Sequence, residues 1–174
     1  MSVGLARQKA EHLVQENGLT QPPIDVEKIA SRLRLPIVRA DLGGEVSGLL
    51  ITKRGAASIC VHQDHHPNRQ RFTIAHEIAH FILGHHNQPG EHVHVDHGNY
   101  ITQRGPRAAK GIDLREIEAN QFAASLLMPS EMLEAHVRKA ARGALHDGHV
   151  VDLASRFEVS EQAMTIRLAS LGFL

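Results

Sequence analysis

The 174-residue sequence has no tryptophan, a single tyrosine and a single cysteine, and its 19 basic side chains are balanced by 19 acidic ones. Because Cys60 stands alone, the chain can form neither an intramolecular disulfide nor a CxxC metal site. A formal net charge of zero argues against a general binder of nucleic acid or of anionic membranes. The scarcity of aromatics predicts a core of Leu, Ile, Val and Ala.

Long apolar runs are also missing from the sequence. No segment could cross a bilayer, and the N-terminal residues 1–18 lack the apolar stretch of a signal peptide, so we expect a cytoplasmic protein without membrane contact. The length suits one domain, residues 1–174. Within it we expect N-terminal helices and a sheet (1–66), central helices and a loop (67–128), and C-terminal helices with helix-turn-helix-like packing (129–174).

Histidine, in contrast, is abundant, and residues 76–80 read His-Glu-Ile-Ala-His. Residues four apart lie on nearly the same face of a helix, so His76 and His80 can bind one metal ion. Glu77 is rotated by roughly 100°, which lets it reach a water molecule without ligating the ion. The surrounding residues are apolar, which predicts a buried helix from about Asn68 to Gly84. Buried imidazoles need polar partners, and a metal ion is one.

The pattern around this central helix predicts an α+β fold of about six helices and a small sheet. Three short strands, each following the last after a Gly-containing turn, predict a three-stranded antiparallel meander. Residues 85–112 are polar and rich in Gly and His, which predicts a long loop. The expected strands are 36–39, 46–52 and 57–62, and the expected helices are 3–17, 25–33, 68–84, 113–128, 130–140, 150–157 and 160–171.

A hydrolytic zinc site normally has a third protein ligand. In the metzincin class a glycine follows the second motif histidine by three residues and the third ligand, a histidine, follows it by six. His86 is at the required distance from His80, but position 83 is Leu and the glycine comes one residue late, at Gly84. A following helix supplies the other candidates, Glu116 and Glu118, in the segment EIEANQF. Asp113 and Glu116 also resemble a capping box, which gives Glu116 a structural role.

Three segments, RFTIAHEIAHFILGH, EIEANQFAASLLMP and LASRFEVSEQAMTIRL, resemble in this order the ImmA/IrrE family of metallopeptidases. The resemblance extends over nearly the whole chain and implies a compact zincin-like α+β fold. It also implies that Glu118 is the third ligand. The predicted site therefore has His76, His80 and Glu118 as metal ligands and Glu77 as the catalytic base. Zinc is the expected ion, although manganese or another divalent ion suits the same ligands.

Family members act on helix-turn-helix repressors, so the resemblance implies a zinc-dependent endopeptidase that cleaves such a partner and thereby controls transcription. One alternative is a metal-bound regulator, or a toxin-like member of a two-gene module, that binds its repressor without cutting it. Another is a DNA-binding regulator, because residues 153–168 have a helix-turn-helix pattern. Arg167 is the only basic residue in 160–171, the segment that would be the recognition helix, so we expect no direct contact with nucleic acid. The oligomeric state stays open.

Two further expectations concern the substrate. An extended peptide could pair with residues 46–50, where Gly48 would allow close approach of a second backbone or form a bulge. An oxyanion stabiliser is also needed, although a solvated loop residue is the simpler interpretation of each candidate. These candidates are Tyr100, His92, His94 and His97, and His85 and His86 are candidates for orienting the ligands.

Overall fold

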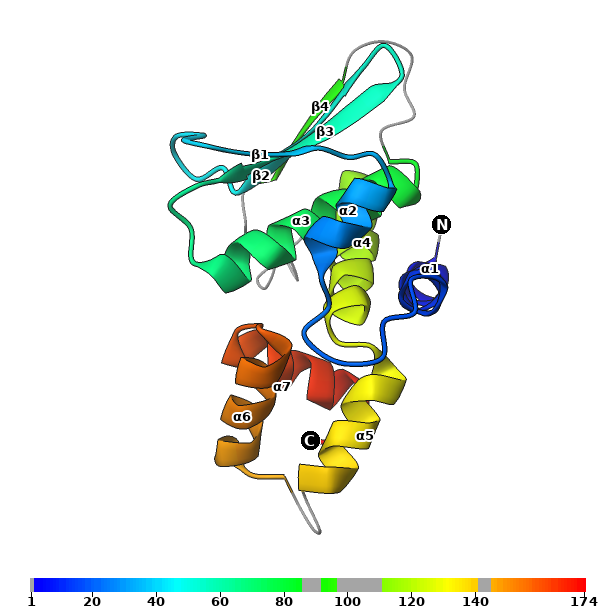
Figure 1. The fold of residues 1–174 in the computed structure, drawn as a ribbon, viewed down its shortest axis with the longest axis vertical. Coiled ribbons are helices and arrows are strands. Elements are labelled where there is room, and N and C mark those ends of the chain that lie inside the picture. The colour runs from blue at the N-terminus through cyan, green and yellow to red at the C-terminus, as the bar shows by residue number, and fades with distance from the viewer. Residues whose placement is uncertain (1, 86–91, 97–110, 141–144) are drawn as a thin grey trace.

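A single mixed sheet lies at one end of the computed structural model, with the helices on one side of it (Figure 1). The structure describes residues 2–85, 92–96, 111–140 and 145–174. The predicted α+β class is confirmed, with seven helices and four strands in the described part of the chain. None of these helices is long and apolar enough to span a bilayer. The elements are α1 (Val3–Glu16), α2 (Val26–Arg32), β1 (Ile37–Ala40), β2 (Gly48–Lys53), β3 (Ala56–His62), α3 (Pro67–Ile82), β4 (His92–Asp96), α4 (Gly111–Leu127), α5 (Ser130–Ala140), α6 (Asp147–Phe157) and α7 (Glu161–Ser170).

The sheet has the strand order β1-β3-β2-β4, so the predicted three-stranded antiparallel meander is wrong in two respects. First, β1 pairs in parallel with β3 instead of antiparallel with β2. Second, β4 lies inside the predicted loop and pairs antiparallel with β2. The β2–β3 hairpin itself turns through Arg54 and Gly55, both at positive φ, as a two-residue hairpin turn requires.

The substrate strand predicted at residues 46–50 is also wrong, because β2 has a hydrogen-bonded neighbour on each side and exposes no edge. Gly48 instead allows close approach of α3. A Cβ atom at this position would lie 2.3 Å from Thr73 Cγ2 and 3.4 Å from Glu77 Oε1. The missing side chain therefore brings the buried face of α3 directly against the sheet.

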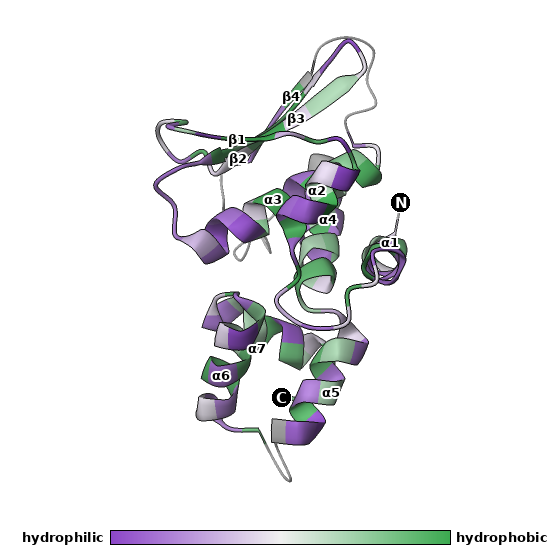
Figure 2. Ribbon diagram, in the orientation of Figure 1, coloured by the Kyte–Doolittle hydropathy of each residue, from purple (hydrophilic) through white to green (hydrophobic). Residues whose placement is uncertain are grey.

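The packing of α3 follows its sequence, which changes from hydrophilic in the first turn to hydrophobic towards the C-terminal end (Figure 2). The residues from Thr73 to His80 are all buried. Ile74 and Ile78 join one core cluster with Leu50 of β2 and Ile59 of β3. The predicted central position of this helix is thus explained by apolar burial on almost all of its sides.

Helix α4 lies between α3 and α1 and brings the third predicted segment to the core (Figure 1). Phe122 and Leu126 are fully buried there. The helix begins at Gly111, before the predicted cap at Asp113. The capping role predicted for Glu116 is wrong, since its carboxylate contacts His76 of α3.

The C-terminal helices are attached to the first turns of α3. Arg71 donates hydrogen bonds to the carbonyl oxygens of Ile24 and Glu158 at 2.9 and 3.3 Å, and it forms an ion pair with the Glu158 carboxylate. Asn68 donates a hydrogen bond to the carbonyl of Val159. Both contacts fix the turn between α6 and α7, where Glu158 adopts a left-handed conformation with φ of 52°.

Candidate metal centre

The two motif histidines point in the same direction from α3, as their spacing predicts. Both are buried, and their Nε2 atoms lie 3.0 Å apart. Two ring nitrogens at this distance need either a shared proton or a cation between them. The pair is therefore preorganised to bind one ion.

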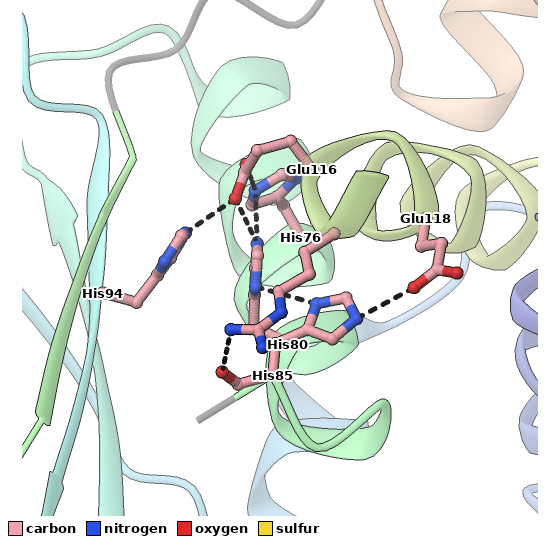
Figure 3. A network of polar contacts seen from close by, with 7 residues as sticks. His76, His80, His85, His94, Glu116 and Glu118 are labelled. Carbon is pink, nitrogen blue, oxygen red and sulfur yellow. Dashed lines mark hydrogen bonds and ion pairs between the residues drawn. The ribbon is translucent and has the colours of Figure 1, made fainter. Parts of the chain in front are cut away.

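The carboxylate that approaches this pair belongs to Glu116 (Figure 3). Its Oε2 lies 3.2 Å from His76 Nε2, and its Oε1 lies 3.5 Å from His80 Nε2. Zinc bonds of about 2.0–2.1 Å in a tetrahedral site place neighbouring ligand atoms roughly 3.3–3.4 Å apart. The two imidazoles and this carboxylate thus lie at separations that suit one small divalent cation.

Glu118, the ligand predicted from sequence, is not brought to the pair. Its Oε2 lies 3.1 Å from His85 Nε2, and His85 Nδ1 lies 3.1 Å from His80 Nδ1. Residues two apart on a helix are rotated by roughly 200°, so Glu116 and Glu118 cannot both face the same ion. The structure thus places Glu116 where the sequence analysis put Glu118, and Glu118 orients His80 through His85. This orienting role of His85 was among the expectations.

Glu77 is fully buried on the side of α3 that faces the sheet. Neither carboxylate oxygen has a hydrogen-bond partner within the described residues. Ligand atoms of Glu77, His76 and Asp96 all lie within 4.8 Å of one another. A buried carboxylate without a donor beside a candidate metal centre is suited to bind the proton of a water molecule.

The protonation states match these roles. Burial lowers the pKa of His80 to about 3, so its imidazole is neutral. Burial raises the pKa of Glu116, but the hydrogen bonds from His76 and His80 outweigh this effect and hold the pKa well below its usual value. Burial, and then repulsion from Asp96 and Glu116, raises the pKa of Glu77. Neutral imidazoles and an ionised carboxylate are the forms that bind a metal ion.

A further histidine reaches the centre from the sheet. His94 of β4 lies with its Nε2 3.5 Å from Glu116 Oε1, and its ring centroid is 3.8 Å from that of His80. Period-two alternation in HVHVD was the signal that could have predicted this strand. Other candidates from the sequence fall outside the described part of the structure, namely His86, His97, Tyr100 and the side chain of His92.

A cavity of about 450 Å³ lies between α3, α4 and α7. It begins one helical turn from the centre, because Phe72 precedes His76 by four residues and Asn120 follows Glu116 by four. Ala124, Met128 and Ile166 make much of the remaining wall apolar. The cavity can accept a large apolar side chain beside the metal centre.

Two imidazoles on an HExxH helix and a carboxylate from a second helix, below a mixed sheet, form the arrangement of a zincin-like metallopeptidase. Comparison with known families agrees with this class. The sequence profile of the peptidase M78 family, described as the IrrE N-terminal-like domain, matches residues 30–169. The chain belongs to this family of metallopeptidases.

Solved structures support the same fold. A transcriptional regulator of Mycobacterium tuberculosis superposes with a TM-score of 0.64 at 17% sequence identity. The match covers 97% of this chain but only 47% of that protein, so this chain has about half of its length. A comparison with curated proteins gives no significant match.

Proposed function

We propose that this protein is a zinc-dependent endopeptidase that acts in the cytoplasm on a partner regulatory protein, a helix-turn-helix repressor. The proposal rests on the convergence of His76, His80 and Glu116 beside the buried carboxylate of Glu77. Membership of the M78 family supports peptidase chemistry. The structural neighbour named as a transcriptional regulator supports a role in gene control.

In this proposal His76, His80 and Glu116 bind the divalent cation, which supplies Lewis-acid chemistry at the scissile carbonyl. Glu77 accepts a proton from the attacking water and delivers it to the leaving amine. Burial raises its pKa, which makes the carboxylate a stronger base than an exposed glutamate. Glu118 and His85 keep the ring of His80 in its binding orientation.

The substrate backbone has one natural position in this proposal, the outer edge of β4. This strand ends the sheet order and pairs only with β2 among the described strands. An extended peptide can add to such an edge through main-chain hydrogen bonds. The cavity between α3, α4 and α7 then receives an apolar side chain of the peptide.

The deciding experiment incubates the zinc-loaded protein with candidate helix-turn-helix repressors, beginning with any that is encoded beside it. We expect defined fragments with the wild type and with Glu45→Gln, a control that changes an exposed carboxylate. Glu77→Gln should bind zinc and repressor and yield no fragments. A stable complex of wild type with intact repressor would favour the alternative, a regulator that binds without cutting.

Metal content distinguishes the two carboxylate candidates. We expect that variants with Ala at His76, His80 or Glu116 no longer contain one zinc ion per chain after dialysis. Glu118→Ala should retain zinc with an affinity about 10–100-fold weaker, as is typical when a residue behind a ligand is lost. If Glu116→Ala retained one zinc ion per chain and Glu118→Ala retained none, Glu118 would be the third ligand.

A further inference from the structure

The placement of His94 goes beyond what three ligands and a base require. Strand β4 alternates its side chains, so the neighbours Val93 and Val95 are 59% and 40% exposed while His94 faces the helices. The ring of His94 extends from the strand towards Glu116 (Figure 3). The edge strand thus contributes one imidazole to the metal centre.

The spacing of the donors suits a metal ion with four protein ligands. Ligand atoms of His76, His80, His94 and Glu116 all lie within 4.8 Å of one another. His76 Nε2 lies 3.0 Å from His80 Nε2 and 3.2 Å from Glu116 Oε2. The other carboxylate oxygen, Glu116 Oε1, lies 3.5 Å from both His80 Nε2 and His94 Nε2. A zinc ion with bonds of about 2.0–2.1 Å requires edges of roughly 3.3–3.4 Å.

We infer that His94 is a fourth protein ligand, which closes the metal site when no substrate is bound. Catalytic zinc sites leave one position open, whereas sites with four protein ligands are closed. The inference depends on metal binding by the other three residues, but not on peptidase activity. In the substrate-free protein the ion is therefore bound by three imidazoles and one carboxylate. Because His94 belongs to the edge strand, a peptide that pairs with β4 acts directly on the residue that must leave.

X-ray absorption of the zinc-loaded protein counts the imidazoles directly. We expect three in the wild type and in Val93→Ala, which changes an outward-facing neighbour on the same strand. His94→Gln should show two imidazoles and an added oxygen, with at least a tenfold weaker zinc affinity in competition with a chelator. If His94 only stabilised an oxyanion, His94→Gln would change neither the number of imidazoles on the zinc ion nor the zinc affinity.

A second variant gives a signal that a misfolded protein cannot produce. His94→Cys should add one sulfur at about 2.3 Å to the zinc spectrum. Two imidazoles in the wild type, no sulfur in His94→Cys and unchanged affinity in His94→Gln would overturn the inference and leave the peptidase proposal intact. A wild-type protein that binds no zinc would overturn both.

Discussion

Glu77 combines full burial with a carboxylate that no described residue hydrogen-bonds. Such an arrangement lowers the stability of the metal-free protein, since a buried polar group without a partner costs about 1–3 kcal/mol. A catalytic base gains from the same surroundings, because its raised pKa lies closer to the pH at which it works. Function and stability are therefore in conflict at this residue.

We predict that Glu77→Gln stabilises the metal-free protein at pH 8, because glutamine cannot ionise and a rise of one in pKa corresponds to about 1.4 kcal/mol. The folded-state pKa of Glu77 lies above its unfolded value near 4.5, so the unfolded state releases this proton more readily. The penalty is absent below pH 4.5 and grows as the pH rises towards the folded pKa. The gain from glutamine should accordingly be small at pH 4 and larger at pH 8 in urea denaturation. A gain that grows towards acid pH would contradict this account.

Sequence alone placed His76, His80 and Glu77 on a buried helix, because helical spacing and apolar neighbours specify both face and burial. It could not choose between Glu116 and Glu118. These residues differ by roughly 200° around the helix axis, and the rotation of α4 against α3 depends on tertiary packing. The apparent capping box at Asp113 also gave Glu116 a plausible local role that the folded chain does not use.

At the scale of elements, strand pairing between neighbours in the chain could be predicted from sequence, whereas pairing between distant strands could not. The β2–β3 hairpin follows from its turn residues and was predictable. The parallel pairing of β1 with β3 was not, because it joins strands that are not consecutive in the chain. Strand β4 was missed since only five residues alternate, within a segment otherwise rich in polar residues.

The contact between α3 and β2 yields a prediction for Gly48→Ala. The new Cβ would lie 2.3 Å from Thr73 Cγ2, so the helix or the strand must shift, at a cost of about 1–3 kcal/mol. Thr73→Ser removes that methyl group and keeps the hydroxyl group. Urea denaturation of both single variants and the double variant should show that Thr73→Ser recovers most of the loss. Strictly additive effects would mean that Thr73 is not the obstacle.

The attachment of the C-terminal helices yields a prediction for Arg71→Ala. Two carbonyl groups, of Ile24 and Glu158, would lose a donor, which should cost about 1–3 kcal/mol. Hydrogen exchange should accelerate in residues 157–160. Arg138→Ala is the control, since this exposed arginine of α5 forms a surface ion pair with Glu134. Equal losses in the two variants would contradict an attachment role for Arg71.

At the scale of the molecule, the metal centre joins segments that are far apart in the chain. Its residues come from α3, from α4 forty positions later, and from β4 between them. The same α3 contacts the sheet on one side, while its first turns attach the α6–α7 turn. A cation bound at this centre therefore links the sheet to the helices at one point.

This linkage predicts a thermal shift. Zinc at 1,000 times its dissociation constant should stabilise the folded protein by about 4 kcal/mol, if only the folded state binds it. For a chain of this size that corresponds to a rise in Tm of about 8–16 °C. His76→Ala should lose the shift, whereas His12→Ala, which changes an exposed histidine of α1, should keep it. The control matters because the chain has 14 histidines that could bind zinc elsewhere. An equal shift in His76→Ala would place the stabilising ion outside the centre formed by α3, α4 and β4.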